Sequence, residues 1–484
     1  MSATNVDEVL EIIGFGCTQF IMLCTCGCIS VFIMNEIMGI TVMAVAIACE
    51  FALSDIERSF LTNAGFLGMI VFGHYTGYTT DLIGRRRMIL YSVGSSLITS
   101  IISVAMPKFY MYLLLRFMVG SFITGASTSN FAYIIEYTAV RIRPHIVTFT
   151  GYFLALGYIY APCLAHFIGS MKCVLFSVGS FDIRLWRLSV LLNTAPGVLA
   201  FIAMFILPES AKYLLSVGKS EKAFNILNGL CKKNRGQDLQ SFGVTSITQP
   251  NLRSDFEGQE RKCFLLQVWL ETIPLFKPPF RRPILLLMMV MSGNFFVGTG
   301  LGSWFMQLRQ RMPDVSETVC QMLDNHWLDM KSGNFTAASC WDTPVDYIDG
   351  VLFGCIVLGV YILISIALIW LNRKIIMLSL LLVATFCGFV LNFINQKLFI
   401  LCAFICFITL CTCCIPLVAN IVCDVVPTHI RGTAISIIIT IARCHTVVAS
   451  QVVGAFLLAH CYLIFNIFVA VALACFVTIF FLPK

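Results

Sequence analysis

Three ionisable side chains lie inside long apolar stretches of the sequence. Glu36 falls in the apolar segment 17–47, Arg116 lies seven positions after Phe109 in a second segment, and Arg443 lies deep in a third. A charge in hydrocarbon costs about 2.5–3.5 kcal/mol on insertion scales. Glu36 and Arg116 are expected at similar depths, so they can pair, either to fix one helix against another or to contact a substrate or a proton. Arg443 can attract an anionic group or chloride, or bind a backbone carbonyl.

Five uncharged residues are further candidates for contact with a small ligand, which their amide and aromatic groups can orient in a central cavity. They are Asn130, Tyr133, Asn294, Trp304 and Gln307. Residues of these types inside apolar segments more often serve helix packing, and both interpretations stay open.

A polar, arginine-rich connection separates the second and third apolar segments. It reads Gly77-Tyr-Thr-Thr-Asp81-Leu-Ile-Gly84-Arg85-Arg86-Arg87. Gly77 and Gly84 allow close approach and a tight reversal, and Asp81 can bind a neighbouring helix N-terminus. The three arginines are predicted to hold the turn on the cytoplasmic side of a membrane.

The composition places these residues in a membrane protein. Hydrophobic residues make up 58% of the 484 residues and charged residues 12%, a balance that a soluble protein of this length would expose as large apolar patches. Segments long enough to cross about 30 Å of hydrocarbon are predicted at 17–47, 60–80, 88–106, 109–137, 146–168, 187–207, 283–304, 350–371, 375–394, 398–421, 433–458 and 462–482. We therefore predict an all-α membrane protein with twelve transmembrane helices.

An internal repeat relates the two halves of the chain. A shift of 288 positions aligns Arg85 with Arg373, Glu136 with Asp424, and Arg143 with Arg431. We predict two six-helix halves, 1–208 and 283–484, joined by a linker at 209–282. The acidic and basic residues at corresponding helix ends can form cytoplasmic latches that part when this side opens.

The distribution of Lys and Arg predicts the orientation. The linker segment 208–282 holds twelve Lys and Arg, so we place it and both termini in the cytoplasm. The loop 313–349 is acidic and carries the sequon Asn334-Phe-Thr336, which indicates glycosylation on the other side. Cys320 and Cys340 share this loop, where oxidation is expected, and we predict a disulfide between them.

The linker itself contains two segments with helical periodicity, 221–231 and 261–270, and the second reads as an interfacial helix. It holds no nucleotide-binding motif, catalytic triad or metal-binding cluster. We therefore expect no enzyme, no metal and no cofactor. The net charge of +7 reflects topology and contact with anionic lipid, and we expect no nucleic acid partner.

Several motifs carry a family resemblance. The connection at 77–87 resembles the loop signature of the major facilitator superfamily. The segment Pro208-Glu209-Ser210-Ala-Lys212-Tyr-Leu214 resembles an element of sugar porters and organic-ion carriers, and Arg443 with its neighbours resembles an arginine in helix 11 of those carriers. The segments 14–20, 49–51 and 116–120, with Glu36, are similar to the synaptic-vesicle-glycoprotein-like branch, above all to insect members.

This resemblance implies the major facilitator fold and a function. We expect a monomeric, multi-pass secondary or facilitative transporter of a small organic solute, an organic ion or a sugar-like compound, with proton coupling as one role open to Glu36. The predicted cytoplasmic gate comprises Gly77, Asp81, Gly84, Arg85, Arg86, Glu136, Arg143, Glu209, Arg373, Asp424 and Arg431. The alternative is a non-transporting protein of a vesicle or the plasma membrane that binds a lumenal ligand or partner.

Overall fold

The structure is a computed structural model in which most of the chain is described. The described ranges are 4–168, 174–178, 181–248, 273–311, 317–324, 347–426, 431–457 and 459–482. The side chains of Asp81, Asp424 and Arg431 lie outside the described part, as do the whole of Asn334, Cys340 and the expected helix at 261–270.

The described part of the chain contains twelve membrane-length helical spans, the number predicted. Nine are single helices: α4 (Asp55–Ile83), α5 (Arg85–Val104), α6 (Phe109–Glu136), α7 (Arg143–Ile168), α17 (Ile348–Trp370), α18 (Arg373–Val390), α19 (Lys397–Val425), α20 (Arg431–Phe456) and α21 (Cys461–Phe480). The first span joins α2 (Cys17–Ile37) to α3 (Gly39–Phe51), and the sixth joins α8 (Leu185–Asn193) to α9 (Ala195–Ile206).

The seventh span is the most irregular. It runs through α13 (Arg281–Asn294), the π-helix η5 (Phe295–Leu301), the 3-10 turn η6 (Gly302–Trp304) and α14 (Phe305–Gln310). By length and composition, eleven helices in the described part can cross a membrane. The twelfth span is α4, which is long enough to cross a membrane but is not among these eleven.

Glycines at the contact between α4 and α6 explain how α4 packs so closely. A Cβ added to Gly68 would meet the Phe117 carbonyl oxygen at 2.2 Å, and one added to Gly120 would meet the Gly65 carbonyl oxygen at 2.1 Å. The backbones of α4 and α6 are therefore in direct contact at these glycines.

Helix α4 begins at a capping box, in which the backbone N–H of Ser54 donates to Glu57 at 2.9 Å.

Helix ends follow the internal repeat. Helices α5 and α18 begin at Arg85 and Arg373, and helices α7 and α20 begin at Arg143 and Arg431. Both pairs of starts are separated by the same 288 positions that align the polar residues in the sequence. The repeat in sequence is thus a repeat in structure.

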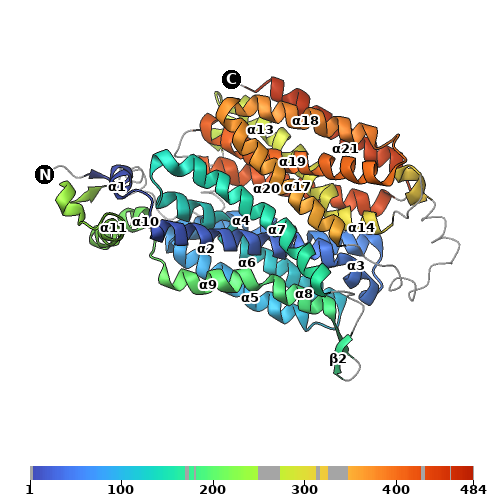
Figure 1. Cartoon of the computed structure of the whole chain (residues 1–484), viewed down its shortest axis with the longest axis horizontal. Helices are drawn as coiled ribbons and strands as arrows, with labels where there is room; N and C mark the ends of the chain where they lie inside the picture. Colours follow the sequence, from blue (N-terminus) through green and yellow to red (C-terminus); the bar gives the residue numbers. More distant parts are fainter. Residues whose placement is uncertain are drawn as a thin grey trace.

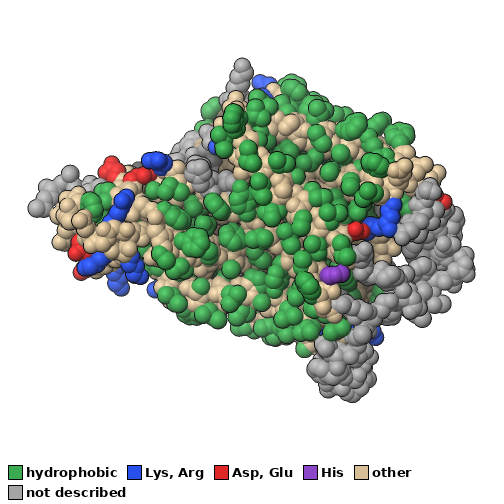
Figure 2. Space-filling model, in the orientation of Figure 1, with side chains coloured by type: hydrophobic (Ala, Val, Ile, Leu, Met, Phe, Trp, Pro, Cys, Tyr) green, Lys and Arg blue, Asp and Glu red, His purple; other side chains and the backbone are tan. Residues whose placement is uncertain are grey.

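The spans run along the long axis of the molecule (Figure 1). One end carries α1 (Val6–Ile13), α10 (Ala211–Ser216) and α11 (Ser220–Arg235), and we call it the linker end. The opposite end carries α3, α8 and α14, and we call it the loop end. Apolar side chains cover the middle of the visible face, and charged side chains gather toward its two ends (Figure 2), as expected for a protein that spans a bilayer.

The short helix α1 is docked at the linker end by one carboxylate. Asp7 accepts hydrogen bonds from Arg143 at 2.6 Å and from Lys212 at 2.7 Å, and the adjoining strand β1 (Thr4–Asn5) pairs in parallel with β4 (Ile247–Thr248). Burial raises the pKa of Asp7, but the hydrogen bonds from Lys212 and Arg143 outweigh it and leave the pKa below its ordinary value. The contact is therefore intact at neutral pH and is lost only in acid.

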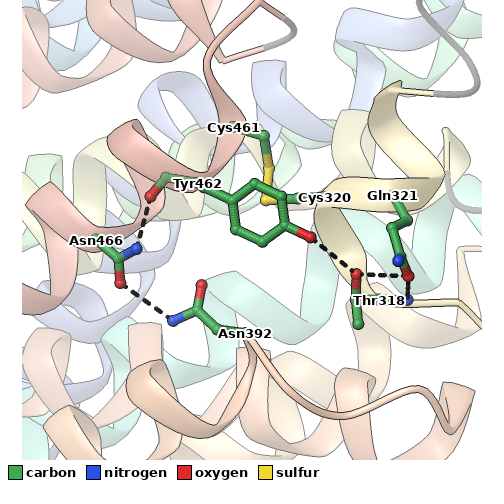
Figure 3. The surroundings of a disulfide bond; sticks show 7 residues. All are labelled: Thr318, Cys320, Gln321, Asn392, Cys461, Tyr462 and Asn466. Carbon is green, nitrogen blue, oxygen red and sulfur yellow. Dashed lines mark hydrogen bonds between the residues drawn. A yellow bond between two sulfur atoms is a disulfide. The ribbon is translucent and has the colours of Figure 1, made fainter.

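The loop end carries a hairpin and a disulfide. Strands β2 (Val174–Val178) and β3 (Phe181–Arg184) pair antiparallel. Cys320 is bonded to Cys461, at the start of α21 (Figure 3). The predicted bridge between Cys320 and Cys340 is therefore wrong, because a cysteine forms one disulfide. Beside it, Tyr462 reaches Thr318 at 3.5 Å, so the segment after the seventh span is tied to the twelfth.

Peptide mapping without reductant tests this bridge. We expect a disulfide-linked peptide that contains Cys320 and Cys461, and we expect Cys461→Ser to make Cys320 reactive toward maleimide because its partner is gone. Cys355→Ser, which removes an exposed free thiol, is the control and should leave Cys320 unreactive. A peptide linking Cys320 to Cys340 would contradict the assignment.

Candidate functional site

A buried ion pair joins α2 to α6. Arg116 donates from Nη1 to Glu36 at 2.9 Å, and the two side chains are 2% and 1% exposed. The Ser100 hydroxyl of α5 lies 3.0 Å from both carboxylate oxygens of Glu36, and Arg116 also donates to Ser103. The Arg116 guanidinium lies over the ring of Tyr112, 5.2 Å from its centroid. The pairing expected from the depths of Glu36 and Arg116 is present.

This cluster lies inside the N-terminal half. Its members come from the first, third and fourth spans, and every hydrogen bond named above stays within that half. Burying two charges is tolerable only where each has hydrogen-bond partners as well as the opposite charge. The arrangement fixes three helices against one another and also buries one acidic side chain, so it fits both roles considered for Glu36. The cluster lies toward the loop end, because Arg116 is seven positions after the start of α6 and Ser103 is one position before the end of α5.

Asn130 and Tyr133 serve packing in this structure. Asn130 donates to the Cys26 carbonyl at 2.9 Å and to the Ser30 hydroxyl at 3.0 Å, which ties α6 to α2. The Tyr133 hydroxyl donates to the Pro208 carbonyl at 2.7 Å. Both side chains are buried, and their contacts favour the packing interpretation.

Asn294 and Gln307 behave differently. They flank the irregular part of the seventh span and are each 1% exposed, and neither amide atom of either side chain has a hydrogen-bond partner among the described residues. A buried amide without a partner costs about 1–3 kcal/mol. Single-turn π-helices inside α-helices are frequent at functional sites. The seventh span thus combines an interruption of its α-helix with buried amide groups that have no hydrogen-bond partner among the described residues.

Glycines let this irregular segment approach two neighbouring helices. A Cβ on Gly298 would lie 2.5 Å from the Thr412 side chain of α19, and a Cβ on Gly300 would lie 2.4 Å from Ala449 of α20. Trp304 then donates from its indole nitrogen to Ser450 of α20 at 2.9 Å. The break is therefore held between the tenth and eleventh spans.

Arg443 of α20 is half-buried, and no ion pair or hydrogen bond joins its side chain to another residue in the described part of the chain. Val447 and Ser450, four and seven positions later, share its helix face. Val447 packs against the core of the N-terminal half, and the Ser450 hydroxyl lies 3.4 Å from that of Thr62 in α4. This face of α20, with Arg443 on it, is turned toward the N-terminal half.

The two halves meet through polar contacts at the loop end. Arg311, directly after α14, donates to both carboxylate oxygens of Asp55 at the start of α4, one of them at 3.3 Å. One turn deeper, the Ser59 hydroxyl donates to Gln451 of α20 at 2.8 Å. A Cβ on Gly454 of α20 would lie 2.9 Å from the Asp55 carbonyl oxygen. The halves are closed together here.

The apolar core divides in the same way. One cluster contains the C-terminal half together with loop-end residues of the N-terminal half, such as Ile40, Phe109 and Ala165. The other contains linker-end residues of the N-terminal half together with the linker, such as Met22 and Leu227. The halves share a core at the loop end and along α7 and α17, where the Tyr152 hydroxyl donates to Ser365 at 2.9 Å. At the linker end the N-terminal half also packs on the linker.

The predicted gate residues of the N-terminal half are joined to one another and to the linker. Arg85 bonds Glu136 at 3.1 Å, and Glu209 accepts the backbone N–H groups of Arg86 at 2.9 Å and Arg87 at 3.3 Å. Gly84 has a φ of 102° and lies against Glu209, so a tight turn and a close approach both require glycine.

Two expectations for this region are corrected. The latch expected from the acidic and basic residues at these helix ends does not form between Glu136 and Arg143, because α1 brings Asp7 to Arg143 and Arg85 pairs with Glu136. A Cβ on Gly77 would meet nothing within 4 Å, so Gly77 makes no close approach in this conformation. Arg373 begins α18 at the position the repeat predicts, and the side chains of its neighbours in the C-terminal set, Asp424 and Arg431, lie outside the described part.

Sequence reasoning missed two features. Asn63 of α4 is fully buried, and neither of its amide atoms has a partner among the described residues. Arg187 of α8 is fully buried and pairs with Glu50 of α3 at 2.5 Å, while Trp186 also donates to Glu50 at 2.6 Å. The signal for Asn63 was an amide in an apolar segment. That for Arg187 was a basic residue just inside the sixth span.

Comparison with known proteins gives this geometry a context. The family described as "Sugar (and other) transporter" matches residues 41–301, more than half of the chain. Synaptic vesicle glycoprotein 2C of Rattus norvegicus is 27% identical over 341 residues, 65% of this chain and 47% of that protein. The synaptic vesicle 2-related protein of Xenopus laevis is 29% identical over 296 residues, 61% of this chain and 48% of that protein. The chain thus spans about half the length of these relatives.

Solved structures share the fold. The xylose transporter XylE from E. coli, in a partially occluded inward open conformation, superposes with a TM-score of 0.68 at 16% identity and covers 97% of this chain and 100% of that one. Its inward open conformation gives a TM-score of 0.66 at 16% identity, with 96% of each chain covered. The twelve-helix architecture of the major facilitator superfamily is therefore the fold of this chain.

Removing one member of the buried pair should destabilise the protein. Glu36→Gln leaves the Arg116 guanidinium without its anion in a dry site, and we expect a loss of about 3–5 kcal/mol, seen as a lower thermal unfolding temperature in detergent. The double variant Glu36→Gln/Arg116→Gln should recover most of it. Glu221→Gln, on the exposed face of α11, is the matched control. Equal unfolding temperatures for Glu36→Gln and wild type would contradict this view of the pair.

Proposed function

Because the chain belongs to the Sugar (and other) transporter family, we propose that this multi-pass membrane protein is a secondary or facilitative transporter of a small organic solute. The family is one of transporters and not of enzymes. The observation that carries the proposal is the broken seventh span, where buried amides with free hydrogen-bonding groups stand beside a π-helix. Interrupted helices near mid-membrane form the substrate sites of many secondary transporters.

The polar groups available to a solute define its class. Asn294 and Gln307 offer both donors and acceptors from the seventh span, and Asn63 offers the same from α4. Arg443 adds a guanidinium on the face of α20 that is turned toward the N-terminal half, and a guanidinium recognises carboxylates and other acceptor groups. These groups support a polar organic solute with several hydrogen-bonding groups, at least one of them a strong or anionic acceptor.

Alternating access supplies the mechanism. The halves are closed at the loop end by Asp55, Arg311, Ser59 and Gln451, and the distribution of basic residues predicts that the linker end is cytoplasmic. In this proposal the structure represents an inward-facing state. A solute would leave toward the linker end, and these contacts would separate when the transporter turns outward.

Proton coupling is assigned to Glu36. It is an acidic side chain buried inside the N-terminal half, and a proton bound there would compete with Arg116 for the carboxylate. One of the similar structures is that of a protein described as a proton:xylose symporter. A proton on Glu36 would release Arg116 from α2, which links protonation to the packing of the N-terminal half.

A second candidate function rests on the relatives. One is named a synaptic vesicle glycoprotein and the other a synaptic vesicle 2-related protein. These names support a vesicle membrane as the location and a protein that binds a lumenal ligand or partner without transport. The two functions differ in one observable, net movement of solute across a sealed membrane.

Uptake into proteoliposomes tests the main proposal. With a panel of organic anions, organic cations and sugars, with and without a pH gradient, we expect at least one acceptor-rich solute to accumulate. Asn294→Ala should lower its uptake by tenfold or more, the effect of losing one or more substrate hydrogen bonds worth about 1.4 kcal/mol together. Arg443→Ala should abolish uptake of an anionic solute, and Arg443→Lys should restore part of it.

Gln240→Ala, an exposed amide of the linker, is the matched control. Unchanged uptake in both Asn294→Ala and Arg443→Ala would remove these residues from the substrate site. If no solute accumulates although the protein is folded and correctly inserted, the binding function is favoured over transport.

The closure at the loop end can be tested separately by hydrogen exchange of the full chain. Arg311→Ala removes the ion pair between the halves, so we expect amides in the first two turns of α4 to exchange on the order of tenfold faster. The charge swap Asp55→Arg/Arg311→Asp should restore part of the protection. Arg309→Ala breaks a 2.6 Å pair with Asp349 within the C-terminal half and should leave α4 unchanged. Equal effects of Arg311→Ala and Arg309→Ala on α4 would contradict a role for Asp55 and Arg311 in closing the loop end.

A further inference from the structure

A groove at the start of α13 lies outside the site described above. It has a volume of about 540 Å³, and its lining residues are Pro278, Pro279, Arg281, Arg282, Leu285, Leu286 and Met289. The segment 273–290 that forms it contains no Asp or Glu. We call it the basic groove.

The two arginines of the basic groove are exposed. No ion pair or hydrogen bond joins the side chain of Arg281 or Arg282 to another residue in the described part of the chain. They lie in the first turn of a transmembrane helix directly after the linker, at the end of the bundle predicted to face the cytoplasm. Two adjacent guanidiniums present donors that match phosphate and carboxylate oxygens.

Below the arginines the groove becomes apolar. Leu285 and Met289 follow Arg281 at intervals of four residues and therefore share its helix face, and they are 44% and 52% exposed. At 1.5 Å per residue, Met289 lies about 12 Å deeper along the helix axis than Arg281. The groove thus offers a cationic rim at the membrane surface and an apolar wall that extends toward the hydrocarbon.

We propose that the basic groove binds an anionic phospholipid of the cytoplasmic leaflet, with its headgroup on Arg281 and Arg282 and an acyl chain along Leu285 and Met289. A water-soluble phosphate compound would use the arginines alone and leave the apolar wall uncovered. A zwitterionic lipid would cover the wall but would neutralise neither arginine. Anionic lipids are concentrated on the cytoplasmic face of membranes and are held there by basic clusters beside transmembrane helices.

Native mass spectrometry of the full chain tests this proposal. The purified protein is equilibrated with equal amounts of phosphatidylserine and phosphatidylcholine, and retained lipid is counted. We expect wild type to retain phosphatidylserine preferentially, and Arg281→Ala/Arg282→Ala to reduce that retention about tenfold. The double variant Lys222→Ala/Lys233→Ala removes the same charge from exposed positions of α11 and should retain phosphatidylserine like wild type.

Two further arms separate the possible sources of the signal. Met289→Trp fills the apolar wall while both arginines stay, and it should also lower phosphatidylserine retention, so the test does not depend on the arginine variant folding. Soluble glycerophosphoserine should not displace the lipid. The proposal is overturned if both groove variants retain phosphatidylserine like wild type, if the lysine control loses it equally, or if glycerophosphoserine displaces it at equal concentration. None of these outcomes depends on transport.

Discussion

Inside a lipid-embedded bundle a charged side chain has no water to bind, so its partner must come from another helix. Three of the ion pairs between helices in the described part of the chain illustrate this. Glu36–Arg116 joins α2 to α6, Glu50–Arg187 joins α3 to α8, and Asp55–Arg311 joins α4 to the end of the seventh span. The first two lie within the N-terminal half and lock it as a unit. The third crosses between the halves and must break for the loop end to open.

Some of these features leave a signal in the sequence, and others arise only when the chain folds. The Glu36–Arg116 pair was predicted because depth in the membrane follows from helix rise and local hydropathy alone. The repeat was predicted because a constant offset is visible in the residues themselves. The disulfide was not, because Cys320 and Cys461 are 141 positions apart and only the folded bundle brings the twelfth span beside the loop.

Other misses have a different physical cause. The pairing of Arg143 was misjudged because its partner Asp7 comes from α1, a short helix outside the membrane whose docking has no hydropathy signal. Asn63 was overlooked because a neutral amide costs less than a charge in an apolar segment and so stands out less. The sequence also predicted Asn130 and Asn294 as equals, and only the hydrogen bonds of Asn130 separate a packing amide from an unpartnered one.

The seventh span connects the features that the proposals treat separately. It begins at the basic groove with Arg281, changes from α-helix to π-helix after Asn294, and leads to Arg311 at the loop end. A regular helix transmits displacement along its whole length, whereas a π turn followed by a 3-10 turn interrupts its backbone hydrogen-bond pattern. The two ends can therefore move separately. A solute bound at the break could draw on Asn294 and Gln307 together and shift α14 with Arg311, while α13 stays packed against α20 and α21. The unpaired amides and the Asp55–Arg311 ion pair at the loop end would then be coupled through one short segment of backbone.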